Sequence, residues 1–120
     1  MNLGEALAGI KSIKPSQYDD EQLVRWLGDM DAKVYRDTIC HYEDAPAAPV
    51  RYSVDEPDAA LMIPEPYSDV YIKWLGAQID YCNAEFDRYN NAMVMYNVLL
   101  GDYLNDYNRT HTHKQSVVRV

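Results

Sequence analysis

Apolar side chains at helical spacing predict two helices in the N-terminal third of the chain. The first covers residues 3–10 and ends before Pro15, because proline lacks the amide that a helix interior needs. The second begins at Asp19, whose carboxylate can cap the first turn while Gln22 reaches back, and extends to about Tyr42. Its apolar stripe, opposite a charged face, consists of Leu23, Trp26, Leu27, Met30 and Val34.

A longer apolar stripe follows Pro66 and advances in alternating steps of four and three residues, the spacing of a coiled-coil seam. Its members are Leu75, Ile79, Cys82, Phe86, Tyr89, Met93, Tyr96, Leu100, Tyr103 and Tyr107. Either one helix or two helices over residues 67–109 fits this pattern. One helix of about forty residues would span roughly 60 Å, against a radius of gyration of about 14 Å for a domain of this size. We therefore favour two helices, with a break between Asn83 and Asn91, where asparagines are poor helix-interior residues.

Residues 43–66 interrupt the helical pattern with prolines and acidic side chains. Unstructured connections of this length are uncommon in compact domains, so the segment is either a loop that contacts something or a small β-hairpin. In a hairpin, Val50–Val54 and Ala60–Ile63 would pair across a turn. The sequence therefore predicts an all-α fold: a small bundle of three to four helices, with a long proline-containing loop or short β-hairpin between the second and third. The predicted single domain is 1–109, followed by a flexible tail at 110–120.

Composition narrows the class of protein. The chain has 120 residues, 48% of them hydrophobic, which is enough for one domain and too short for two ordinary ones. Its formal charge of -8 disfavours specific nucleic-acid binding, which needs basic side chains to displace counterions from phosphates. No segment has the roughly 20 apolar residues of a membrane-spanning helix or the pattern of an export signal. We therefore expect an unexported protein that binds neither nucleic acid nor membrane.

Residues with catalytic or metal-binding chemistry do not form a recognisable motif. Cys40 and Cys82 lack metal-ligand spacing and are expected to be reduced. His111 and His113 supply two ligands where a structural zinc site needs four, so we expect them to be solvated. No serine or cysteine stands in a nucleophile motif, and no glycine-rich loop is present to cradle a phosphate. The sequence thus predicts a protein that is not an enzyme and holds no metal or cofactor.

Tyrosine is frequent, with eleven residues, most of them after residue 66. It buries a large area and keeps a hydroxyl that can remain hydrated, which suits protein–protein contacts. A thin helical domain can equally use tyrosine for a half-exposed core, and both interpretations stay open at this point. The candidate interface residues come from the loop, the C-terminal stripe and the tail: Tyr52, Val54, Leu61, Ile63, Tyr89, Tyr96, Tyr103, Tyr107 and Val118.

Two stretches resemble a known family. Residues 64–111 read PEPYSDVYIKWLGAQIDYCNAEFDRYNNAMVMYNVLLGDYLNDYNRTH, and residues 14–35 read KPSQYDDEQLVRWLGDMDAKVY. They look like segments of small tailed-phage and prophage proteins from Gram-positive hosts and, more distantly, of the head–tail connector family. Ala84 is a departure, because similar proteins commonly place glycine after the asparagine.

The resemblance implies a helical head-completion or adaptor protein that forms a ring under the portal and joins capsid to tail. Its implied partners are portal and tail or head-completion proteins and further copies of itself, at the head–tail junction of the virion and in the host cytoplasm before assembly. A ring of identical subunits needs two different adhesive surfaces on each one, which aromatic helix faces, the loop at 50–63 and the tail can supply.

The alternative is an acidic phage-encoded binding or regulatory module, for example an inhibitor that mimics nucleic acid. Such a mimic would concentrate carboxylates on one face, whereas the sequence scatters them between helices and loop.

Overall fold

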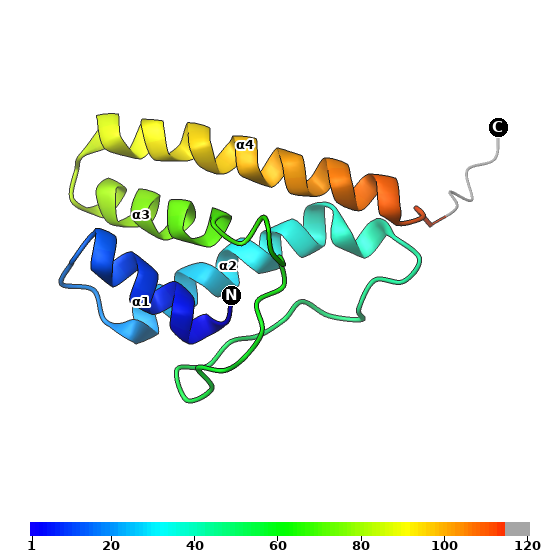
Figure 1. Cartoon of the computed structure of the whole chain (residues 1–120), viewed down its shortest axis with the longest axis horizontal. Coiled ribbons are helices and arrows are strands. Elements are labelled where there is room, and N and C mark those ends of the chain that lie inside the picture. The colour runs from blue at the N-terminus through cyan, green and yellow to red at the C-terminus, as the bar shows by residue number, and fades with distance from the viewer. Residues whose placement is uncertain (115–120) are drawn as a thin grey trace.

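The structure is a computed structural model that describes residues 1–114, and these form an elongated bundle of four α-helices (Figure 1). The helices are α1 (Leu3–Ile13), α2 (Asp20–Asp37), α3 (Val70–Cys82) and α4 (Phe86–Thr110), with a 3-10 turn, η1 (Ile39–His41), after α2. The bundle measures 53 × 33 × 23 Å, and α3 lies between α4 on one side and α1 with α2 on the other (Figure 1). The predicted all-α class is confirmed, since the part of the chain that the structure describes contains no strand.

Polar side chains cap the first two helices. Asp19 accepts a hydrogen bond from the Gln22 amide at 2.9 Å, as its position predicts, but the expected return bond from the Gln22 side chain does not form. Asn2 and Glu5 form a reciprocal capping box at the start of α1, with distances of 2.8 and 3.0 Å. The prediction of one helix as far as Tyr42 was too long, because α2 ends at Asp37 and the chain tightens into η1.

α3 and α4 are separate helices, as we favoured, and the break lies at residues 83–85. The Glu85 amide donates to the Asp80 carbonyl at 2.9 Å and the Ala84 amide to the Tyr81 carbonyl at 3.0 Å. These two bonds make a Schellman motif, which requires a left-handed residue just after the helix. That residue is Ala84, with φ at 59°, a conformation that is unfavourable for any residue with a Cβ.

The centre of the core is α3. Tyr71, Leu75 and Ile79 are buried in it. α1 approaches α3 closely because Gly9 lacks a side chain, and a Cβ there would lie only 3.0 Å from Ile72 Cδ1. Lys14 Nζ, just after α1, contacts the buried Asp80 carboxylate of α3 at 2.5 Å. The chain thus packs its N-terminal helices and α4 on opposite sides of one buried helix.

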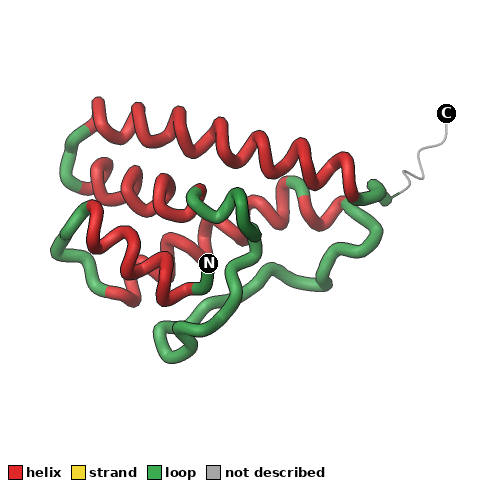
Figure 2. Tube along the Cα trace, viewed as in Figure 1, coloured by secondary structure: helices red, strands yellow, loops and turns green. Residues whose placement is uncertain are grey.

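The segment between η1 and α3 is a long loop along one edge of the bundle (Figure 2). The hairpin between Val50–Val54 and Ala60–Ile63 does not form. Ala60 instead makes an isolated bridge with Asn2, and the Leu3 amide donates to the Ala59 carbonyl at 2.9 Å. The first amides of a helix have no partner within that helix, so the start of α1 offers donors with which the loop pairs.

Residues 111–114, which we expected to belong to a flexible tail, lie along the end of η1. His113 forms an isolated bridge with Tyr42, and the Lys114 amide donates to the His41 carbonyl at 2.8 Å. The Glu43 amide donates to the Thr112 carbonyl at 2.9 Å. This contact joins the end of α4 to the start of the loop. Within residues 1–114, no helix combines the length and the apolar character needed to cross a membrane.

Ala84→Gly should stabilise the protein by about 1 kcal/mol, because glycine adopts positive φ without the penalty that alanine incurs. Urea unfolding should show a higher midpoint with an unchanged slope. Ala8→Gly, on the exposed face of α1, is the matched control and should lower stability by roughly 0.5–1 kcal/mol. A loss of stability in both variants would contradict the strain assigned to Ala84.

Candidate interaction surface

A buried carboxylate on α2 anchors the long loop. Asp31 is fully buried, and the Tyr71 hydroxyl of α3 lies 2.8 and 2.9 Å from its two oxygens. The Tyr52 hydroxyl, from the loop, donates to Asp31 Oδ2. Both hydroxyl oxygens accept loop amides in turn: Met62 donates to Tyr52 at 2.9 Å and Ile63 donates to Tyr71 at 2.8 Å. Two consecutive amides of the loop are therefore tied, through two tyrosines, to one carboxylate.

Burial and hydrogen bonding act on Asp31 in opposite directions. Burial raises the pKa of Asp31 to about 6, while the hydrogen bonds from Tyr52 and Tyr71 favour the ionised form and limit this rise. Burial and the neighbouring Asp31 charge raise the pKa of both tyrosines, so they remain protonated donors. Near neutral pH, the centre is an ionised carboxylate that accepts from two phenols.

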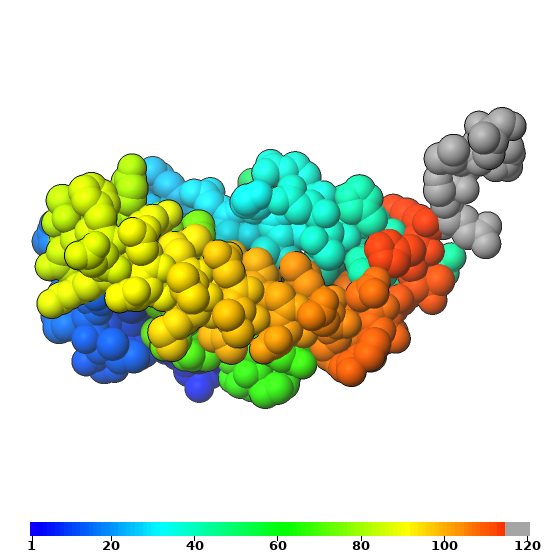
Figure 3. Space-filling model, turned by 90° about the horizontal axis from the view of Figure 1, so that it is seen from above, coloured from blue at the N-terminus to red at the C-terminus, as the bar shows by residue number. Residues whose placement is uncertain are grey.

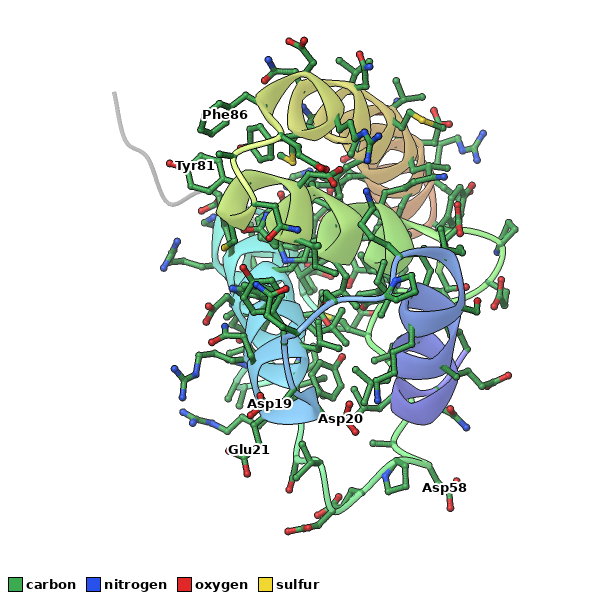
Figure 4. The ribbon with its side chains drawn as sticks, turned by 90° about the vertical axis from the view of Figure 1, so that its left-hand side faces the viewer. Asp19, Asp20, Glu21, Asp58, Tyr81 and Phe86 are labelled. Carbon is green, nitrogen blue, oxygen red and sulfur yellow. The ribbon has the colours of Figure 1, made fainter. Side chains whose placement is uncertain are left out.

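Among the described residues, eight large apolar side chains are exposed, and five of them lie on α3 and α4; the other three are Ile13 at the end of α1 and Val50 and Val54 in the loop. Tyr81 and Phe86 are 55% and 54% exposed, and Val94, Met95 and Val98 are 63%, 51% and 59% exposed. Figure 4 shows Tyr81 and Phe86 at the turn between the two helices, directed away from the bundle. Figure 3 shows α4 as a ridge along one face of the molecule, with no other element over it. We call Val94, Met95 and Val98 the α4 outer surface.

The tyrosines of the C-terminal stripe lie on the opposite face of α4. Tyr96 is buried with its ring centroid 5.1 Å from that of Trp74, and Tyr103 is buried with its centroid 5.6 Å from that of Tyr67. Burial raises the pKa of Tyr96 and of Tyr103 to about 12. Tyr89 and Tyr107 are half-buried. Of the two interpretations of these tyrosines, the structure favours the core.

The interface candidates in the loop also include both buried and exposed residues. Leu61 and Ile63 are buried, and Tyr52 is half-buried through its bond to Asp31. Val54 is 37% exposed, and it lines an open groove between the loop and α2. The remaining candidate, Val118, lies outside the described residues.

The interface candidates taken from the C-terminal apolar stripe lie on the correct helix, α4, but on its inner face. Apolar residues repeating at seam spacing mark the side that packs inside the monomer. The signal for the outer surface was present as Val94, Met95 and Val98, three apolar residues set among asparagines on the otherwise polar side.

The histidines and cysteines belong to packing contacts or to the surface. The His111 ring stacks on Tyr107 with centroids 3.7 Å apart, so it is half-buried rather than solvated as we expected. His113 Nε2 lies 2.8 Å from Asn108 Oδ1, which also accepts the Tyr42 hydroxyl at 2.9 Å. Cys40 and Cys82 are free thiols. Among residues 1–114, no three His, Cys, Asp or Glu side chains converge in a way that could hold a metal ion.

No known protein family, curated protein or solved structure matches this chain.

The contribution of Asp31 to the free energy of unfolding should decrease as the pH rises. The pKa of Asp31 changes from 3.8 in the unfolded chain to about 6 in the fold. The folded state thus binds more protons within this interval, and the Asp31 contribution decreases by about 3 kcal/mol from the lower pH to above the higher one. Asp31→Asn removes this titration. Urea unfolding of both proteins across the interval should show the wild type losing stability relative to the variant, and a constant difference would contradict the assignment.

Tyr52→Phe should release the loop, because the Met62 amide loses its acceptor and Asp31 loses a donor. We expect a loss of about 1–3 kcal/mol in stability. Trypsin cleavage after the adjacent, exposed Arg51 should accelerate. Tyr81→Phe, at an exposed ring, is the matched control. Equal cleavage rates after Arg51 in the two variants would show that the hydroxyl does not hold the loop.

Proposed function

We propose that this protein is a structural component of virion assembly, a head–tail connector or adaptor whose copies form a ring between the portal and the tail. The observation that carries the proposal is the α4 outer surface, where Val94, Met95 and Val98 are each more than half exposed. Exposed apolar side chains that gather on one element are typical of protein–protein contacts. The resemblance of residues 64–111, which include this surface, supplies the kind of assembly.

A second surface lies across the bundle from the first. The loop runs along the edge opposite α4 (Figure 1), and Val50 and Val54 are exposed on it. Subunits of a closed ring meet head to tail, so each must offer two different surfaces facing in different directions. The α4 outer surface and the loop are arranged in this way.

The anchor at Asp31 supports a role for the loop in binding. A loop that orders only on binding loses conformational freedom at that moment, which weakens the complex. Here Tyr52 and the amides of Met62 and Ile63 already hold the loop in place before any partner arrives. The loop is therefore preorganised as a contact element.

Inactivating this coding sequence in a phage or prophage that carries it should yield heads and tails that accumulate separately in electron micrographs. Complementation with the wild-type chain should restore joined virions, and Val94→Asp combined with Val98→Asp should not, because two charges then stand in the contact. Asn105→Asp adds a charge to an exposed position of α4 about two turns beyond Val98 and should complement normally.

Circular dichroism should show native folding for both variant proteins, because the substituted side chains are exposed. Joined, infectious virions in the absence of the coding sequence would overturn the proposed function. Normal complementation by the double variant would overturn the role of α4 in it.

One observation favours the alternative of an acidic regulatory module. Figure 4 shows Asp19, Asp20 and Glu21 close together at the start of α2, with Asp58 farther along the same lower edge of the view, on the loop beside α1. Asp20 is already paired with Lys11 within the chain. Replacing Asp19, Glu21 and Asp58 by asparagine or glutamine should leave virion assembly intact under the connector proposal. A nucleic-acid mimic would instead lose its inhibition, so the two functions respond to different variants.

A further inference from the structure

We propose that a second copy of this chain covers the α4 outer surface before assembly, with the two α4 helices antiparallel and the two Met95 side chains meeting on a two-fold axis. The inference names a partner for the surface used in the proposed function and rests on that function only for its biological role. The pairing itself follows from exposure and charge on α4.

The surface is apolar at its centre and uncovered in the monomer. Met95 is 51% exposed and Val98 is 59% exposed, and Leu99 beside them is half-buried. α4 packs on α3 through its inner face, where Tyr96 and Tyr103 are buried. No element within residues 1–114 crosses the outer side (Figure 3). A partner helix that lies along α4 would remove these side chains from water.

The charges on this helix select the orientation. Arg88 and Asp102 lie seven residues before and seven residues after Met95, and this spacing places all three on one line along the helix. In an antiparallel pair centred on Met95, Arg88 of each copy faces Asp102 of the other, and the contact occurs twice. A parallel pair would place Arg88 opposite Arg88 and Asp102 opposite Asp102, and like charges repel.

Both charges are available for such a contact. The Arg88 side chain is 70% exposed, and it forms an ion pair with Glu85, three residues earlier, at 3.2 Å. Asp102 is also exposed. The same two-fold register sets the small Ala92 of one copy against Val98 of the other, which lets the helices approach each other closely.

A two-fold contact closes on itself and cannot propagate around a cyclic ring. The pair is therefore a resting form, which keeps the apolar surface covered until another partner displaces the second copy. The contact is one helix wide and about 21 Å long between residues 88 and 102, so we expect a dissociation constant in roughly the micromolar range. That strength permits exchange during assembly.

Sedimentation velocity on the full chain tests the pairing. The wild type should be a dimer at about 100 µM, and Val98→Asp should be a monomer. Arg88→Glu and Asp102→Arg should each weaken dimerisation by about tenfold, and the two together should restore it to within about threefold of wild type. Asp29→Arg makes the same charge change on an exposed position of α2 and should have no effect.

Cross-linking tests the position of the axis. In a chain carrying Cys40→Ser and Cys82→Ser, Met95→Cys should oxidise to a disulfide-linked dimer, because a residue on a two-fold axis meets its own copy. Asn97→Cys, on another side of α4, should remain monomeric in the same reaction. These readouts need no virion, so they report on the pairing alone.

Three results would overturn the inference: a wild type that stays monomeric at about 100 µM, single charge reversals that the double variant does not rescue, or equal cross-linking of Met95→Cys and Asn97→Cys. A monomeric wild type that still joins heads to tails would refute the pairing and leave the proposed function standing. If the protein forms the proposed dimer but virions assemble without it, the pairing stands and the proposed function is refuted.

Discussion

The arrangement of the loop depends on one buried negative charge. Burying a carboxylate without partners is costly, and Asp31 is fully buried on α2. The charge is accommodated because Tyr52 and Tyr71 donate to it from two other parts of the chain, and each hydroxyl also accepts a loop amide. Loss of any member leaves another polar group buried without a partner. α2, α3 and the loop are therefore held in one mutual geometry by hydrogen bonds as well as by apolar packing.

The two faces of α4 have different roles: one packs in the core of the monomer, and the other is available for association. Its inner face packs aromatic rings against Trp74 and Tyr67, and its outer side exposes Val94, Met95 and Val98. α3 lies in the middle of the bundle and exposes Tyr81 and Cys82 only at its C-terminal end, whereas α4 lies at the edge and is exposed along one side. Because the two faces are separate, the surface of α4 can change without disturbing the core that holds it in place.

Local rules predicted the parts of the fold that depend on neighbours in sequence. Asp19 caps α2 and the chain breaks after Asn83, because both features need only residues within one or two turns. Of the two alternatives for residues 43–66, the hairpin does not form, because the Ala60 backbone pairs with Asn2 across the fold instead of with residues 50–54. Pattern alone could not rank these partners, because the free amides at the start of α1 come close to the loop only after folding.

The sequence by itself determined the helical class and the cap at Asp19, and it favoured a break between α3 and α4, since period, proline and asparagine act locally. Only the tertiary structure decided that Asp31 joins Tyr52 to Tyr71, that Asn2 pairs with Ala60, and that Tyr42 pairs with His113. These outcomes join residues far apart in the chain, and their energies come from burial, which no local pattern measures.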